Sequence, residues 1–269
     1  MARRVTVFLY GALTYVFFLG TFSYAIGFIM DMVVPKSIND GVATPFELAL
    51  LINVALLGLF GVQHTIMARP AFKRWWTKII PAAAERSTFV LATNVILCAL
   101  FWQWRPMPAV VWHVDNEVFA TALLAVSWAG WGIVLLSTYL IDHFELFGLK
   151  QAWYCLRDKA YPVTAYKERL FYKVVRHPLM FGFMVAFWST PHMTLSRLVF
   201  AVVTTAYVLF GLQIEERDLV KAHGAAYEDY RRRVPMLIPF LGGRRKQALP
   251  LPGKTVTAAA PESEQLAGL

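Results

Sequence analysis

Charged residues are scarce in this chain of 269 residues. Only 16% of them are Asp, Glu, Lys or Arg, whereas 58% are apolar. A soluble domain has roughly 25% charged residues. The low charge content argues against a soluble protein and favours one that is embedded in a membrane.

Cysteine is also scarce, with Cys98 and Cys155 as the two examples. Cys98 lies within an apolar run and Cys155 within a polar segment, so we expect no disulfide between them. No cysteine or histidine spacing is typical of a metal site. The sequence therefore indicates neither a disulfide-stabilised fold nor a bound metal.

Long uncharged runs are what the chain has in abundance. Four runs approach or exceed the roughly 18 to 20 residues that cross a hydrocarbon core: Val5–Met30, Leu48–Ala68, Ser87–Trp104 and Val118–Ile141. The first is too long for a cleaved signal peptide, so we interpret it as a retained span. Residues 177–214 carry one charge, Arg197, and suit a helical hairpin. We expect an all-α, polytopic membrane protein with five to seven transmembrane helices.

The net charge of +9 could indicate nucleic-acid binding, but its distribution indicates membrane topology instead. With the N-terminus in the cytoplasm and alternating spans, all but three of the 26 Lys and Arg residues face the cytoplasm. The exceptions are Lys36, Arg105 and Arg197. This is the positive-inside bias of membrane proteins. We expect a multi-pass protein of the cell membrane that contacts lipid, has both termini in the cytoplasm and binds no nucleic acid.

The chain has no internal repeat and no second soluble domain. We expect a single membrane domain over residues 1–240, with a core for ligand binding over 166–240. The aromatic and charged stretch 142–173 is expected to fold against the membrane domain, and residues 69–78 to form a short helix on the membrane surface. Residues 241–269 lack an apolar period, so we expect a disordered cytoplasmic tail.

Polar residues gather at both feet of the predicted hairpin. Residues 176–178 are Arg-His-Pro, and Glu215 and Glu216 end the second leg. The proline predicts a helix start, with free N–H groups and a positive dipole end. The glutamates oppose the dipole of their own helix and need a cationic partner. This pattern suits a zwitterionic, cationic ligand; the alternatives are an arginine that reaches lipid phosphate and ion pairs with Arg217 or Lys221.

The C-terminal third resembles the isoprenylcysteine carboxyl methyltransferases and their bacterial relatives. The matching residues are Arg176-His177-Pro178-Leu179-Met180-Phe181-Gly182, Glu215-Glu216, Tyr227-x-x-Tyr230 and Pro235-Met236-Leu237-Ile238-Pro239. The resemblance implies an integral-membrane enzyme that binds S-adenosylmethionine in a cytoplasm-facing pocket. It implies these cofactor-binding residues: Arg176, His177, Gly182, Glu215, Glu216, Tyr230 and Arg233. Tyr227 and Tyr230 could pack on an adenine or on the protein itself. Met180 stands where the family often has Tyr.

Three further segments are similar to the bacterial methanethiol S-methyltransferases: residues 60–70, 101–106 and 141–151. This second resemblance extends over residues 1–240. It implies a bacterial inner-membrane enzyme that methylates the sulfur of methanethiol, a small thiol, and yields dimethyl sulfide and S-adenosylhomocysteine without a metal.

Such a reaction needs a thiolate, because a thiol is a poor nucleophile. His64, Asp142 and His143 lie at the expected cytoplasmic ends of the second and fourth spans, so they could converge beneath the hairpin. We hypothesise that His64 or His143 acts as base or water relay and that Asp142 orients it.

Other readings of the sequence stay open. The acceptor could be a larger thiol or a prenylcysteine carboxylate, and a denitrification-associated relative shares parts of the hairpin region. A non-enzymatic transporter or scaffold is a further alternative, although it leaves the polar residues at both feet of the hairpin unexplained. The sequence does not indicate an oligomeric state.

Overall fold

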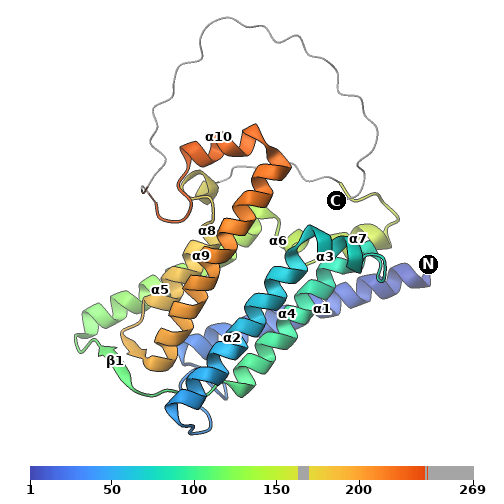
Figure 1. Cartoon of the computed structure of the whole chain (residues 1–269). Coiled ribbons are helices and arrows are strands. Elements are labelled where there is room, and N and C mark those ends of the chain that lie inside the picture. Colours follow the sequence, from blue (N-terminus) through green and yellow to red (C-terminus); the bar gives the residue numbers. More distant parts are fainter. Residues whose placement is uncertain (163–169, 240, 242–269) are drawn as a thin grey trace, which may run out of the picture.

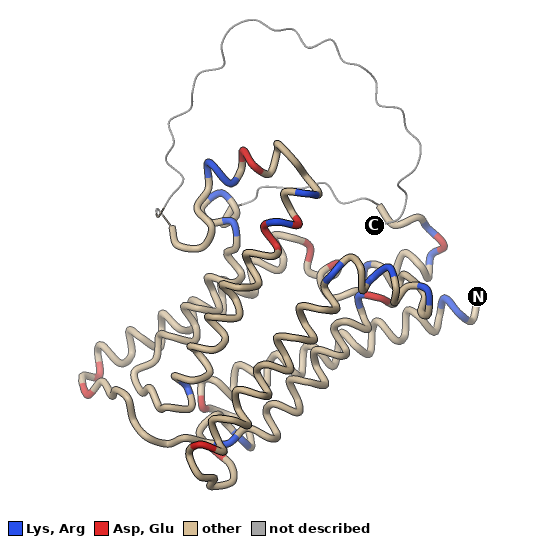
Figure 2. Tube along the Cα trace, in the orientation of Figure 1, with Lys and Arg blue, Asp and Glu red and all other residues tan. Residues whose placement is uncertain are grey.

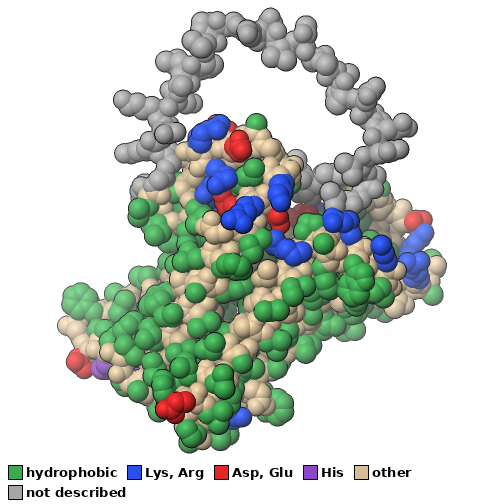
Figure 3. All heavy atoms as spheres, in the orientation of Figure 1, with side chains coloured by type: hydrophobic (Ala, Val, Ile, Leu, Met, Phe, Trp, Pro, Cys, Tyr) green, Lys and Arg blue, Asp and Glu red, His purple; other side chains and the backbone are tan. Residues whose placement is uncertain are grey.

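The computed structural model describes residues 1–162, 170–239 and 241, and these are mostly helical (Figure 1). Five helices are long and apolar enough to cross a membrane: α1 (Ala2–Met30), α2 (Phe46–Ala68), α4 (Ala82–Gln103), α5 (Glu117–Ile141) and α9 (Leu195–His223). Apolar side chains cover much of the visible sides of this bundle (Figure 3), as contact with lipid requires. The predicted all-α, polytopic fold is confirmed, with five long spans at the lower end of the expected range.

The first leg of the predicted hairpin is short. Helix α8 (Pro178–Trp188) has 11 residues, with His177 at its N-cap and Pro178 in its first turn. At about 1.5 Å per residue it is roughly half as long as a hydrocarbon core is thick. The helix start predicted from Pro178 is therefore confirmed, whereas a seven-span bundle is not found among the described residues.

Helix α8 packs tightly against α5 at a pair of glycines. A Cβ atom on Gly130 would lie 2.6 Å from the backbone nitrogen of Ala186, and one on Gly182 would lie 2.8 Å from the oxygen of Gly130. The Ser127 hydroxyl also donates to the Ala186 carbonyl at 2.9 Å. Small residues allow such close helix contact. Close backbone packing and a side-chain hydrogen bond thus attach the short leg to α5.

Shorter elements collect at one end of the bundle. They are α3 (Pro70–Trp76), α6 (His143–Leu146), α7 (Leu149–Leu156), the 3₁₀ turn η1 (Leu170–Lys173) and α10 (Ala225–Arg233). Most Lys and Arg residues lie at this end, together with the N-terminus (Figure 2). Helix α7 packs on α1 and α4, with buried Ala152 beside Gly11. We call this the cation-rich end.

The opposite end contains a two-stranded antiparallel sheet that the sequence did not predict. Strand β1 (Val110–His113) precedes α5, and β2 (His192–Thr194) precedes α9. The strands come from distant parts of the chain. Because they are short, they show no alternation of apolar and polar residues from which a strand could be predicted. They tie the loop before α5 to the turn between α8 and α9.

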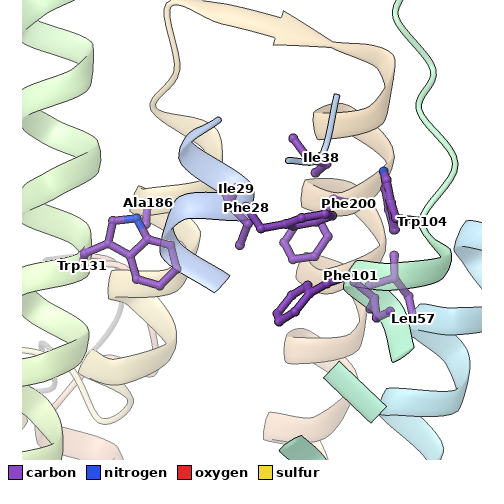
Figure 4. Packing of buried hydrophobic residues seen from close by; sticks show 10 residues of the cluster. Phe28, Ile29, Ile38, Leu57, Phe101, Trp104, Trp131, Ala186 and Phe200 are labelled. Atoms are coloured by element: carbon purple, nitrogen blue, oxygen red, sulfur yellow. The ribbon is translucent and has the colours of Figure 1, made fainter. Parts of the chain in front are cut away.

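An aromatic core closes the bundle near this sheet. Phe28, Phe101, Trp104 and Phe200 are buried together there (Figure 4). The side chain of Asn53 donates to the Arg105 carbonyl at 2.7 Å and accepts from its N–H at 2.9 Å. The packed aromatic side chains leave this part of the bundle interior apolar, and the buried charged side chains of the predicted hairpin lie at the cation-rich end. The predicted tail lies outside the described residues, except for Leu241.

Candidate active site

The carboxylate of Glu216 is the centre of the polar cluster at the cation-rich end. Glu216 lies near the end of α9 and is 3% exposed. Its Oε1 lies 2.8 Å from His177 Nε2 and accepts a 2.8 Å hydrogen bond from the Tyr227 hydroxyl. These contacts join the start of α8, the end of α9 and the first turn of α10. The sequence places these residues up to 50 positions apart, and the fold brings them to one carboxylate.

Two guanidinium groups face the other oxygen of this carboxylate. Arg176 Nη1 and Arg231 Nε each lie 3.0 Å from Glu216 Oε2. The contacts are close, but Oε2, Arg176 Nε and Arg176 Nη1 are buried without an aligned hydrogen-bond partner in the described part of the chain. Buried polar groups are nearly always hydrogen-bonded. The arginines and Glu216 Oε2 are therefore paired by charge, but these ion pairs lack aligned hydrogen bonds among the described residues. We call Arg176, His177, Glu216, Tyr227 and Arg231 the Glu216 cluster.

The segment after α10 holds this cluster in place. The backbone N–H of Arg176 donates to the Pro235 carbonyl at 2.9 Å, and that of His177 donates to the Met236 carbonyl at 3.1 Å. These bonds satisfy backbone groups just before α8, where the helix offers them no partner. The proline-flanked segment after α10 thus orients both side chains toward Glu216.

The two tyrosines of α10 face the protein. Tyr227 and Tyr230 are buried beside Val234, and the Tyr230 hydroxyl donates to the Tyr172 carbonyl at 2.6 Å. Burial and the hydrogen bond to Glu216 raise the pKa of Tyr227, so its hydroxyl stays a proton donor. Of the two expectations for this pair, packing on the protein is the one that the contacts support.

Other predicted cofactor residues lie in different surroundings. Glu215 is half-exposed, and its Oε2 lies 3.7 Å from His177 Nδ1. Gly182 lies in the α5–α8 contact, which is a sufficient reason for a glycine. Arg233 pairs with Asp229 at 2.8 Å on the surface of α10. Cofactor contacts by these three residues stay predictions.

The sequence predicted no role for Arg231, and for Tyr227 it predicted packing on an adenine or on the protein rather than a hydrogen bond to Glu216. A usable signal was present: positions 227, 230 and 231 are three and four residues apart, so they share a face of one helix. What the sequence could not show is that this face turns toward Glu216.

His143 lies in a second buried cluster at the same end. Its Nδ1 lies 2.7 Å from the Thr138 hydroxyl and its Nε2 lies 2.8 Å from the Tyr15 hydroxyl. The imidazole stacks on Tyr139, with ring centroids 4.3 Å apart. Burial lowers the pKa of His143, although Asp142 acts in the opposite direction. Both ring nitrogens are thus engaged, and the imidazole is neutral near pH 7.

Asp142 has its own partners. It accepts from the backbone N–H of Glu145 at 3.1 Å and forms an ion pair with Lys150. The hydrogen bonds at the ring of His143 come instead from Thr138 and Tyr15. An orienting role for Asp142 stays a prediction, and the structure adds two hydroxyl groups to the candidates for that role.

His64 differs from both of these histidines. Its ring lies between Phe60 and Phe89, with centroids 5.3 Å and 4.8 Å away. Its Nδ1 is buried and has no hydrogen-bond partner among the described residues. The hydroxyl of the next residue, Thr65, donates to the hydroxyl of Tyr207 in α9 at 3.4 Å. This end of α2 therefore borders the helix that carries Glu216, and it presents a vacant nitrogen in an apolar setting.

Comparison with known proteins gives extensive matches. The chain is 51% identical over 246 residues to methanethiol S-methyltransferase 2 of Bradyrhizobium diazoefficiens, which covers 91% of this chain and 95% of the relative. It is 51% identical over 240 residues to methanethiol S-methyltransferase of Mycobacterium tuberculosis, covering 89% and 98%. A Nurim homolog of Drosophila pseudoobscura is 32% identical over 167 residues, covering 60% and 66%. No protein-family model matches the chain, and no solved structure matches it significantly.

Proposed function

Since this chain belongs to the methanethiol S-methyltransferase family, we propose that it transfers the methyl group of S-adenosylmethionine to the sulfur of methanethiol. The products are dimethyl sulfide and S-adenosylhomocysteine. The observation that supports this reaction is the 51% identity to proteins of that name over about nine-tenths of the chain. The two buried clusters and His64 support where in the protein it takes place.

The Glu216 cluster fits the methionine end of this methyl donor. That end carries a carboxylate and an ammonium group, so it needs cationic donors beside an anionic acceptor. Arg176 provides buried guanidinium donors and Glu216 a buried carboxylate, and the ion pair between them lacks an aligned hydrogen bond among the described residues. The start of α8 adds a positive dipole end. When bound, S-adenosylmethionine supplies an electrophilic methyl group on a sulfonium ion.

The structure favours different tasks for the two glutamates. Glu216 is surrounded by its own protein partners and is suited to holding Arg176 and His177 in position. Glu215 is half-exposed beside His177 Nδ1 and is the better placed of the two to reach an ammonium or ribose hydroxyl of the cofactor. Tyr230 and Arg233 are suited to a supporting role in cofactor binding, because their contacts with Tyr172 and Asp229 help to shape and position α10.

His64 is the residue we favour as the base for the thiol. Its Nδ1 has no hydrogen-bond partner in the part of the chain that the structure describes, whereas both nitrogens of His143 have hydroxyl partners. A neutral imidazole can accept the thiol proton and so raise the thiolate fraction. The phenyl rings beside His64 offer an apolar surface that suits a methyl-sized thiol and excludes water, which strengthens the attraction between a thiolate and a sulfonium.

The reaction is tested with purified protein in detergent, supplied with S-adenosylmethionine and one acceptor at a time. Methanethiol, larger thiols and a prenylcysteine are compared, and volatile and nucleoside products are quantified by mass spectrometry. We expect dimethyl sulfide and S-adenosylhomocysteine in equal amounts from methanethiol. Faster turnover of a prenylcysteine or a larger thiol would replace the proposed acceptor. Failure to bind S-adenosylmethionine would favour a transporter or scaffold.

The location of the cofactor is tested separately by calorimetric titration with S-adenosylhomocysteine. His177→Ala and Glu216→Gln should weaken its binding, whereas Arg105→Ala, at the opposite end, should not. Normal affinity in both site variants would rule out the Glu216 cluster while leaving the reaction itself intact.

A further inference from the structure

Two histidines face each other across the small sheet, at the end of the protein opposite the Glu216 cluster. His113 of β1 and His192 of β2 are directly paired in the strand register. Their Nδ1 atoms lie 3.1 Å apart, and the ring centroids are 5.2 Å apart. Directly paired residues of an antiparallel ladder project from the same face. The backbone register therefore brings two imidazoles together at a surface that the methyl-transfer reaction does not use.

The separation of these nitrogens matches the bite of a single metal ion. Zn–N bonds are about 2.0–2.1 Å long, so two nitrogens on one ion lie roughly 2.9–3.4 Å apart for right-angled to tetrahedral geometry. The observed 3.1 Å falls within this interval. The side chain of His113 is 56% exposed, so its ring can turn to direct its lone pair at an ion rather than at the other ring.

Asp115 adds the carboxylate that such sites use behind a histidine. Its Oδ1 lies 3.7 Å from His113 Nε2, on the side of the ring away from His192. A histidine ligand commonly donates its second N–H to a carboxylate, which selects the tautomer and makes the bound nitrogen more basic. The 3.7 Å separation is just beyond hydrogen-bond distance, and closing it would hold the proton on Nε2 and leave Nδ1 free to act as a ligand.

We propose that His113 and His192 form a two-histidine chelate for a late divalent transition metal, with Cu²⁺ bound most tightly and Zn²⁺ and Ni²⁺ less so. Imidazole nitrogen suits these ions, and Cu²⁺ leads them in affinity. In the described part of the chain, no group of three or more metal-binding side chains occurs, so water completes the coordination. The bound ion joins β1 to β2 and so links the loop before α5 to the turn between α8 and α9.

The test uses the full-length protein in detergent, purified without a histidine tag so that the tag cannot bind the metal. Isothermal titration with Cu²⁺ and Zn²⁺ measures stoichiometry and affinity, and electron paramagnetic resonance of the Cu²⁺ complex reports its nitrogen ligands. We expect one site per chain with two imidazole nitrogens. His113→Asn and His192→Asn should each abolish it, and Asp115→Asn should weaken it by about tenfold.

His223→Asn serves as the matched control, because His223 is an exposed histidine at the cation-rich end. Its copper affinity should equal that of the unmodified protein. The two site variants should keep their methyl-transfer activity, which shows that they are folded. Copper affinity that is unchanged in both site variants, or the absence of a one-to-one complex in the unmodified protein, would show that the two rings only share a hydrogen bond.

Discussion

His177 and His143 are both buried at the cation-rich end of the protein, 7% and 5% exposed, yet they have opposite surroundings. His177 contacts a carboxylate that also faces two guanidinium groups. His143 contacts two hydroxyl groups and a stacked tyrosine ring. A buried carboxylate can hold a charged neighbour, whereas hydroxyl groups suit a neutral one. Burial alone therefore does not define a site: the charge of the partner decides which ligand a buried histidine can bind.

Removal of the Glu216 carboxylate should have the largest effect, because it takes away the charged partner that distinguishes His177 from His143. Glu216→Ala leaves Arg176 and His177 buried without their anionic partner. Breaking a buried ion pair from one side costs about 3–5 kcal/mol, so we expect a marked loss of thermal stability together with loss of S-adenosylhomocysteine binding. Differential scanning fluorimetry and calorimetric titration measure the two effects.

Arg233→Ala is the control for this change, because Arg233 forms an ion pair with an exposed aspartate on the outside of α10. We expect its stability to stay close to that of the unmodified protein. Equal stability of the Glu216 and Arg233 variants would mean that the buried cluster contributes no more than a surface pair.

His64 Nδ1 has no partner among the described residues, whereas both ring nitrogens of His143 contact hydroxyl groups. His64→Ala should lower kcat by about 100-fold or more, in the range typical of a general base, and should leave S-adenosylhomocysteine affinity unchanged. His64→Gln, which retains a polar side chain of similar length, should be equally slow because glutamine cannot accept the thiol proton.

Steady-state kinetics over a range of pH distinguish this role from a packing role. Loss of a base changes the pH profile of kcat, whereas a packing defect lowers kcat at every pH alike. An unaltered profile in His64→Gln would move the search for the base to His143.

A smaller effect is expected where one hydrogen bond to the carboxylate is removed without a change of shape. Tyr227→Phe deletes the hydroxyl that donates to Glu216 Oε1. A hydrogen bond to a charged group contributes about 1.5–3 kcal/mol to stability, so we expect a lower melting temperature and a smaller loss of S-adenosylhomocysteine affinity than in Glu216→Ala. Titration of Tyr230→Phe in parallel provides the comparison, because the Tyr230 hydroxyl donates to the carbonyl of Tyr172 instead.

The smallest effect concerns the pH dependence of stability at His143. Burial lowers its pKa below the ordinary value of about 6.5, so the unfolded chain takes up a proton before the folded protein does. The stability that His143 contributes is therefore complete above about pH 6.5 and is lost as the pH falls toward the lowered pKa. His143→Gln should show a flatter melting temperature between pH 7 and pH 5. A slope equal to that of the unmodified protein would assign the acid sensitivity to other groups.

Several features of the fold and the site could be predicted because their signals are local. Uncharged runs predict spans, and Pro178 predicts the start of α8 because proline fixes its own backbone and lacks an N–H. A cationic partner for Glu216 was predicted from its position at a helix end, but as Arg217 or Lys221 rather than as Arg176. The contribution of Arg231 was not, because it depends on how α10 folds back on α9.

The amino-acid sequence by itself determined that this chain lies in a membrane, where its spans begin and which end collects positive charge, because each property depends on neighbouring residues. The tertiary structure alone decided which buried polar atoms meet and which stay vacant. Glu216 of α9 contacts side chains from the start of α8 and from α10, His64 Nδ1 has no partner among the described residues, and His113 meets His192 across two strands. Contacts between residues far apart in the chain have no signature in either segment alone, since they form only when packing brings the segments together.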